Sequence, residues 1–178
     1  MSGFDFSQVP QDKLVEIGAR SFNTVDALWF LEVEERYGFD VAYEIDVRVW
    51  QRFSPIHARR LLEHLNIRES TPVRTVARLI QADPLSSLQK PEFVSLTDSE
   101  ARFRCTDCPT QTARIRDGKE LFPGEPVCRV MYQGYASAVD PRVKVTCLTC
   151  PPRTLTRGGY PSEYWCQWQV EMTTDGGG

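Results

Sequence analysis

Apolar residues in the first half of the chain repeat at helical spacing. Over residues 12–37 they surround much of the helical circumference, which predicts a long, largely buried helix that ends at Gly38. Three further helices are predicted, over residues 39–53, 54–66 and 73–81. Prolines at their first positions favour the starts at Pro55 and Pro72.

The pattern changes after residue 88, where short segments of alternating apolar and polar residues predict strands. The predicted strands cover residues 92–97, 101–105, 142–147 and 164–172, and two helices cover residues 110–116 and 124–139. This order indicates an α+β fold, with an N-terminal helical layer packed on a cysteine-bearing mixed α/β domain that has a small, mostly antiparallel sheet. We expect a helical region over 1–88, a cysteine-rich region over 89–174 and a flexible tail over 175–178.

Composition and charge limit the classes of function. A chain of 178 residues can bury a hydrophobic core, and its net charge of −3 gives no electrostatic reason to expect nucleic acid as a partner. It has no apolar run of about 18 residues that would span a membrane. Its first residues lack the basic and apolar segments of a signal peptide. We therefore expect a cytoplasmic protein without a membrane partner, whose thiols stay reduced.

All six cysteines lie after residue 104, and four of them form two CxxC pairs. A proline follows each pair, so each pair is expected where a strand gives way to a turn. Such turns let two sulfur atoms converge on one ion, and two pairs supply four thiolates. The sequence predicts a metal site formed by Cys105, Cys108, Cys147 and Cys150, with zinc as the cofactor and an iron–sulfur cluster as the alternative.

The remaining cysteines, Cys128 and Cys166, have two interpretations. Cys166 shares a strand face with Trp168, which favours a core position, and Cys128 lies on a predicted helix near other apolar residues. Metal ligation is the alternative for both. For the CxxC pairs the alternative is redox exchange, which requires the pair to open a helix, and only Cys105 and Cys108 meet that requirement.

Three carboxylates fall on apolar helix faces. Asp46 lies in the middle of the apolar face of residues 39–53, and Asp26 and Glu32 lie between apolar residues of the preceding helix. A carboxylate in such a place is costly unless it is paired or ligated. We predict that Asp46, Asp26 and Glu32 converge in an interior pocket as catalytic bases or ligand-binding groups. The alternative is an ion pair with a nearby arginine, namely Arg20, Arg36 or Arg52.

Other familiar catalytic signals are absent from the sequence. The two histidines, His57 and His64, fall on one edge of a predicted helix, where exposed positions are expected. The chain has no HExxH, GxSxG, P-loop or GxGxxG motif, so the chemistries of those motifs have no support.

The chain resembles an uncharacterised prokaryotic family of cytosolic proteins. Residues 26–40 and 44–50 resemble its N-terminal helices, and residues 140–152 with Tyr164-Trp-Cys-Gln-Trp resemble its C-terminal signature. That family looks related to aminothiazoline-carboxylate-hydrolase-like proteins and, more remotely, to 4-vinyl-reductase-like ligand-binding domains. The resemblance implies an α+β domain that encloses a ligand pocket and often forms a homodimer.

The cysteine pattern carries part of this resemblance. Asp107-Cys108-Pro109, Cys150 and Cys166 match cysteine positions of the related domains, whereas Cys105 and Cys147 are extra. Together the signals predict a metal-binding protein with a small-molecule pocket. If the pocket is catalytic, the expected chemistry is hydrolysis by a metal-bound or carboxylate-activated water. A closed four-thiolate site has no open position for such a water. The alternatives are a small-molecule or redox sensor without catalysis, and a structural zinc domain that serves a partner protein.

Overall fold

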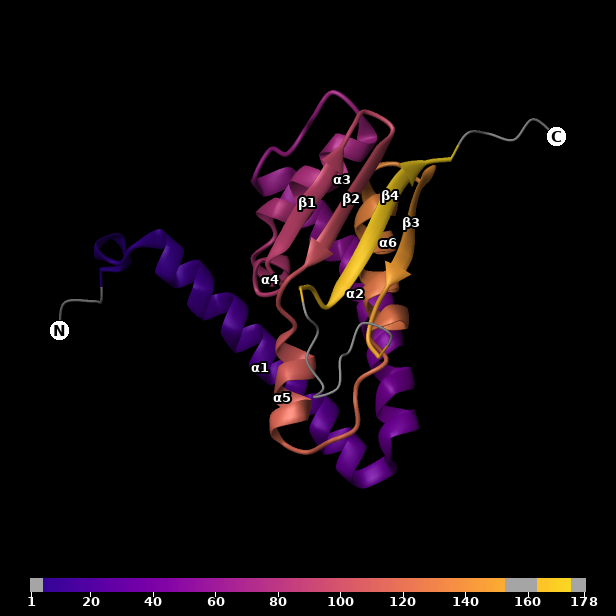
Figure 1. Ribbon diagram of the computed structural model, residues 1–178. Coiled ribbons are helices and arrows are strands. Elements are labelled where there is room, and N and C mark those ends of the chain that lie inside the picture. The colour runs from indigo at the N-terminus through magenta and orange to yellow at the C-terminus, as the bar shows by residue number, and fades with distance from the viewer. Residues whose placement is uncertain (1–4, 153–162, 174–178) are drawn as a thin grey trace.

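The computed structural model describes residues 5–152 and 163–173 and shows an α+β fold, as predicted (Figure 1). The helical part contains η1 (Phe6–Gln8), α1 (Gln11–Tyr37), α2 (Phe39–His64), α3 (Pro72–Ala82) and α4 (Pro84–Ser87). The following part contains β1 (Pro91–Leu96), β2 (Glu100–Cys105), α5 (Pro109–Arg116), α6 (Gly124–Val139), β3 (Val143–Thr149) and β4 (Cys166–Met172). The predicted tail, residues 175–178, lies outside the described residues.

The strands form an antiparallel sheet in the order β1-β2-β4-β3. One face of the sheet is buried beneath α3 and α6 (Figure 1). On that face Phe103 and Trp168 both pack against Tyr132 of α6. The other face carries polar pairs such as Arg104 with Glu92, which explains the alternating pattern of the strands. The helical layer and the cysteine-bearing part therefore share one hydrophobic core.

Helix α2 is continuous through Pro55, so the predicted break between residues 53 and 54 is wrong. Proline interrupts the hydrogen bonding of a helix because it has no N–H. Here the Ser54 hydroxyl donates a hydrogen bond to the Trp50 carbonyl at 2.5 Å. Ser54 and Pro55 also pack directly on Gly134 of α6, where a side-chain Cβ would lie 2.7 Å from the Ser54 Cβ. We attribute the continuity of α2 to this packing on α6.

The close approach of α2 and α6 gives a test of the fold. Gly134→Ala is expected to lower the free energy of unfolding by about 1–3 kcal/mol, because the new methyl group overlaps Ser54 and Pro55. Urea denaturation measures the change. Gly18→Ala in α1 is the matched control, since no atom of a neighbouring element in the described part of the chain lies within 4 Å of its Cβ position. The control should be neutral or slightly stabilising, because alanine favours a helix over glycine. Equal losses in both variants would contradict the described contact.

The prediction that the first helix is largely buried is wrong. In α1 only Ala19 is buried, and Val25, Leu28 and Trp29 are 55%, 56% and 71% exposed. The N-terminal half of α1 projects away from the sheet, and the C-terminal half runs alongside α2 (Figure 1). Apolar residues of α1 lie on all sides of the helix, but the rest of the described chain covers one face of it. None of the described helices is long and apolar enough to cross a membrane.

Candidate functional site

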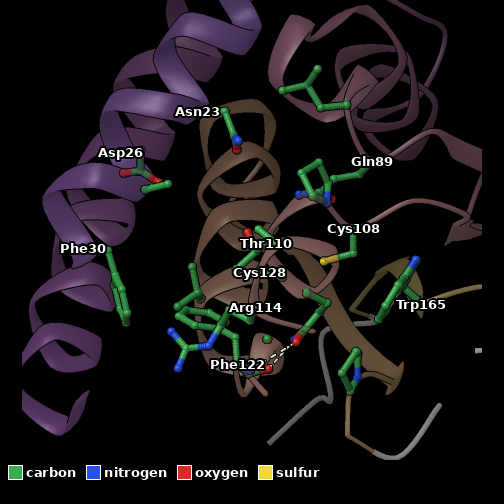
Figure 2. Close-up of a pocket in the computed structure, with 18 of the residues that line it drawn as sticks. Asn23, Asp26, Phe30, Gln89, Cys108, Thr110, Arg114, Phe122, Cys128 and Trp165 are labelled. Carbon is green, nitrogen blue, oxygen red and sulfur yellow. Dashed lines mark hydrogen bonds between the residues drawn. The ribbon is translucent and has the colours of Figure 1, made fainter. Parts of the chain in front are cut away.

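A cavity of about 190 Å³ lies between the helical layer and one end of the sheet. Its size is comparable with the roughly 150 Å³ cavity that holds a benzene molecule in a protein core. Asp26 and Phe30 face it from α1, and Cys108 and Trp165 lie on the opposite side (Figure 2). The lining is mostly apolar and includes five of the six cysteines, namely Cys105, Cys108, Cys128, Cys150 and Cys166.

The sheet topology brings these cysteines together. Strands β2 and β3 run in the same direction on either side of β4. The C-terminal ends of β2 and β3 and the start of β4 therefore lie together at one end of the sheet. Cys105 ends β2, Cys150 follows β3 and Cys166 starts β4. Cys128 of α6 and Cys108, which precedes α5, lie near the same end of the sheet. All six cysteines are free thiols.

Cys166 is the sulfur on which the other groups converge. It pairs directly with Cys105 across β2 and β4, and the Trp168 indole N–H donates a hydrogen bond to its Sγ at 3.1 Å. The side chains of Cys105 and Cys150 are its other polar neighbours, and the Cys105 Sγ lies 3.5 Å from the Tyr132 hydroxyl. Hydrogen bonds from Cys105, Cys150 and Trp168 together hold the pKa of the Cys166 thiol well below its ordinary value. Cys166 is therefore the thiol of the group that most favours the anionic form.

The pKa values of the neighbouring thiols are raised, in contrast to that of Cys166. The hydrogen bond to Cys166 raises the pKa of Cys105, and hydrogen bonds with Cys147 and Cys166 raise that of Cys150. Burial raises the pKa of Cys108 to about 12, and burial also raises that of Cys128. Without a metal, the cluster therefore favours one thiolate surrounded by neutral thiols.

Two helices begin at the cysteine cluster. Cys108 is the residue before α5, and the nearby backbone N–H groups of Gln111 and Thr110 partly offset the increase in pKa that burial of its thiol causes. Helix α6 begins at Gly124, where an added Cβ would lie 3.2 Å from the Cys150 Sγ. The N-terminus of a helix carries partial positive charge and stabilises an anion. Both helix starts therefore favour negative charge on the sulfur atoms.

The structure places Asp26 of α1 and Asp46 of α2 together on the opposite wall of the cavity. Burial and the nearby charge of Asp26 raise the pKa of Asp46 to about 7. Burial also raises the pKa of Asp26, and a hydrogen bond with Trp50 partly offsets the shift of both carboxyl groups. Near neutral pH the pair is therefore expected to carry one shared proton, as closely placed carboxylates do.

Two of the predicted site residues lie elsewhere. Glu32 is exposed on α1 and pairs with Arg36 at 3.3 Å, which is the alternative that the sequence left open. It does not line the cavity. Cys147 hydrogen-bonds with Cys150 but is not part of the cavity lining. The structure thus joins Asp26 and Asp46 with Cys105, Cys108 and Cys150, and separates them from Glu32.

The other charges around the cavity are paired. Arg114 binds the Glu34 carboxylate through two hydrogen bonds of 2.9 and 3.3 Å and lies over the Phe39 ring at 5.1 Å. Lys119 joins Glu34 at 3.2 Å, and Asp107 pairs with Lys90 at 3.0 Å. Among the described residues no cation pairs with Asp26 or Asp46. The carboxylate pair therefore supplies the uncompensated charge of the cavity.

Sequence reasoning missed the central place of Cys166 and the pairing of Arg114 with Glu34. The period-two pattern of the last strand placed Cys166 on the buried face, but its neighbours there depend on β4 lying beside β2. Arg114 gave no local signal, since its partner lies 80 residues earlier. In the described parts of the chain, no three His, Cys, Asp or Glu side chains are already arranged around a position for a metal ion. Metal binding remains a prediction.

Comparison of the chain with curated proteins gave no match, and comparison with solved structures gave none. One family model matches residues 6–172, which include every helix and strand described above. The match covers the cysteine cluster and both cavity aspartates. The chain therefore belongs to the family described as "Family of unknown function (DUF6125)".

Proposed function

We propose that this protein binds zinc through its buried thiols and hydrolyses a small molecule held in the adjoining cavity. One observation carries the proposal, namely that a single cavity is lined by five cysteines and by the Asp26–Asp46 pair. Soft thiolate ligands suit zinc, and the two helix starts compensate the negative charge that such a group of ligands brings. The size of the cavity limits the ligand to a small molecule.

The carboxylate pair supplies acid–base chemistry. With its pKa at about 7, Asp46 is present in both protonated and ionised forms at neutral pH. The protonated form donates a proton to a leaving group, and the ionised form accepts one from water. Asp26 stabilises the proton on the pair, and Trp50 orients the carboxyl groups. Bound zinc would supply a Lewis acid that polarises the bond to be broken.

The resemblance to aminothiazoline-carboxylate-hydrolase-like proteins supports the hydrolytic part of this proposal. The three cysteines that match the related domains, Cys108, Cys150 and Cys166, all line the cavity. The resemblance to 4-vinyl-reductase-like domains supports the small-molecule pocket. A homodimer and a cytoplasmic location remain expectations of the same resemblance.

The metal part of the proposal is tested by elemental analysis of protein purified without a metal-affinity tag. We expect about one zinc ion per chain, together with thiols that react only after denaturation. Detection of iron together with inorganic sulfide would indicate an iron–sulfur cluster as the cofactor instead of zinc. Protein without metal, prepared under reducing conditions and still unable to take up added zinc, would contradict the proposal.

The catalytic part is tested with Asp46→Asn and p-nitrophenyl acetate as a small hydrolytic probe. Loss of the proton-transfer group is expected to reduce turnover by about 100-fold or more, with zinc content unchanged. Glu32→Gln is the matched control, because this acid is exposed and lies outside the cavity. Equal turnover by wild type and Asp46→Asn would exclude the acid–base role.

A further inference from the structure

Helices α1 and α2 run in opposite directions and bring two acids face to face. The helices are joined by Gly38 alone, and the ring of Phe22 in α1 lies 6.2 Å from that of Trp50 in α2. Asp26 lies one helical turn after Phe22, and Asp46 lies one turn before Trp50. Because residues four apart share a helix face, this register places Asp26 opposite Asp46. Both acids line the cavity.

Aromatic rings lie around this carboxylate pair. The cavity lining includes the side chains of Phe22, Phe30, Trp50, Phe122 and Trp165. Phe30 lies one turn beyond Asp26 on the same face of α1, and its ring is 5.4 Å from that of Phe122 (Figure 2). The face of an aromatic ring carries partial negative charge and attracts a cation. The rings and the carboxylates therefore favour the same kind of ligand.

The described part of the chain supplies no cation to the carboxylate pair. The cationic side chains of the cavity lining, Arg114 and Lys119, both bind the carboxylate of Glu34. In contrast, the buried carboxylate of Asp83 has three side-chain partners of its own. A carboxylate that is removed from water without a partner is costly. The cavity therefore holds negative charge that a bound cation would compensate.

We infer that the cavity binds a small aromatic amine in its protonated form, with the ammonium group between Asp26 and Asp46 and the ring among the aromatic side chains. This inference rests on the small-molecule pocket of the proposed function and names its class of ligand. An ammonium group has three N–H donors, so one ligand can donate to both carboxylates. A cavity of about 190 Å³ has room for one six-membered ring and a short side chain, since roughly 150 Å³ is enough for benzene.

Three ligands of similar shape and different charge test the inference. Isothermal titration calorimetry at pH 8, where Asp46 is mostly ionised, measures the binding of benzylamine, benzyl alcohol and benzoate to the wild-type protein. We expect the cationic benzylamine to bind at least about tenfold more tightly than the neutral alcohol, because its hydrogen bonds are charge-assisted. Benzoate should bind most weakly. Equal affinity for the amine and the alcohol, tighter binding of benzoate, or no binding of benzylamine would overturn the inference.

A double variant, Asp26→Asn with Asp46→Asn, assigns the selectivity to the carboxylate pair. Its affinity for benzylamine is expected to fall by about tenfold or more, whereas its affinity for benzyl alcohol should stay within about twofold of wild type. Glu32→Gln is the matched control, because Glu32 is an exposed acid of α1 outside the cavity lining, and it should keep the wild-type preference. A double variant that still prefers benzylamine would overturn the inference. Near-ultraviolet circular dichroism checks that the variants are folded.

The outcome for the ligand class is separate from the outcome for the proposed function. Zinc content and turnover of p-nitrophenyl acetate are measured on the same wild-type protein. A protein that prefers benzylamine but has neither zinc nor turnover would support this inference and contradict the proposed function. A protein that has zinc and turnover but does not prefer benzylamine would overturn this inference alone.

Discussion

Replacing Asp83 by alanine is expected to lower the free energy of unfolding by about 3–5 kcal/mol, because three side chains lose the buried carboxylate to which they hydrogen-bond. The Asp83 side chain is fully buried between α3 and α4. One oxygen is 3.0 Å from the His57 Nε2, and the other accepts hydrogen bonds of 2.7 Å from the hydroxyls of Tyr135 and Ser86. Alanine would leave all three side chains without their buried partner.

The electrostatics of Asp83 agree with this expectation. Burial raises the pKa of a carboxyl group, but hydrogen bonds from His57, Tyr135 and Ser86 outweigh it and lower the pKa of Asp83 below 3.8. A carboxyl group with a lowered pKa in the folded state stabilises the protein above its unfolded pKa. That contribution is lost as the pH falls through the folded pKa. Asp83→Ala should therefore have its full effect at neutral pH.

Urea denaturation at pH 7 measures the loss. Asp98→Ala is the matched control, because Asp98 also binds a side chain of another element, in an ion pair with Arg74, but is 70% exposed. An exposed pair contributes less than about 1 kcal/mol. Similar losses in the two variants would show that the buried hydrogen bonds of Asp83 do not join α2, α4 and α6 as the structure describes.

The elements of the fold followed from local patterns in the sequence. Helix α6 was predicted over residues 124–139 and has the same bounds, because its apolar spacing and both of its ends are local signals. The predicted break at Pro55 and the predicted burial of α1 failed, since both depend on what packs against the helix. The half-buried position of His57, which was expected to be exposed, likewise depends on Asp83, 26 residues further along.

Part of the candidate site could also be predicted from the sequence, and part of it could not. The meeting of Asp26 and Asp46 could be predicted, because an acid on the apolar face of each of two neighbouring helices turns toward the space between them. The place of Cys166 could not be predicted, because it depends on β4 lying between β2 and β3. CxxC spacing reports which cysteines are close along the chain. Strand order decides which sulfur atoms become neighbours.

Asp46→Asn is expected to stabilise the protein by about 2–4 kcal/mol at pH 8, although the proposed function requires this residue. The pKa of Asp46 is about 7 in the folded protein, against an ordinary value of 3.8 for an aspartate side chain. Each pKa unit corresponds to about 1.4 kcal/mol. Asparagine resembles the protonated acid, so the variant avoids the cost of holding an ionised carboxylate in the cavity.

The sign of the pH dependence follows from linkage. Between pH 4 and 7 the folded protein holds a proton on Asp46 that the unfolded chain has released. Stability from this group is therefore complete below pH 4, falls as the pH rises to 7 and is constant above. The difference between Asp46→Asn and wild type should be small at pH 4 and largest at pH 8.

Urea denaturation of both proteins at several pH values between 4 and 8 measures this difference, which includes the coupling of Asp46 to Asp26, because every other titrating group is shared. Glu32→Gln should follow the wild-type curve, since Glu32 is exposed and paired with Arg36. A constant difference between Asp46→Asn and wild type across the range would mean that Asp46 is not buried beside Asp26. A difference that grows with pH, together with lost turnover, would show that the cavity keeps a destabilising acid because its chemistry needs one.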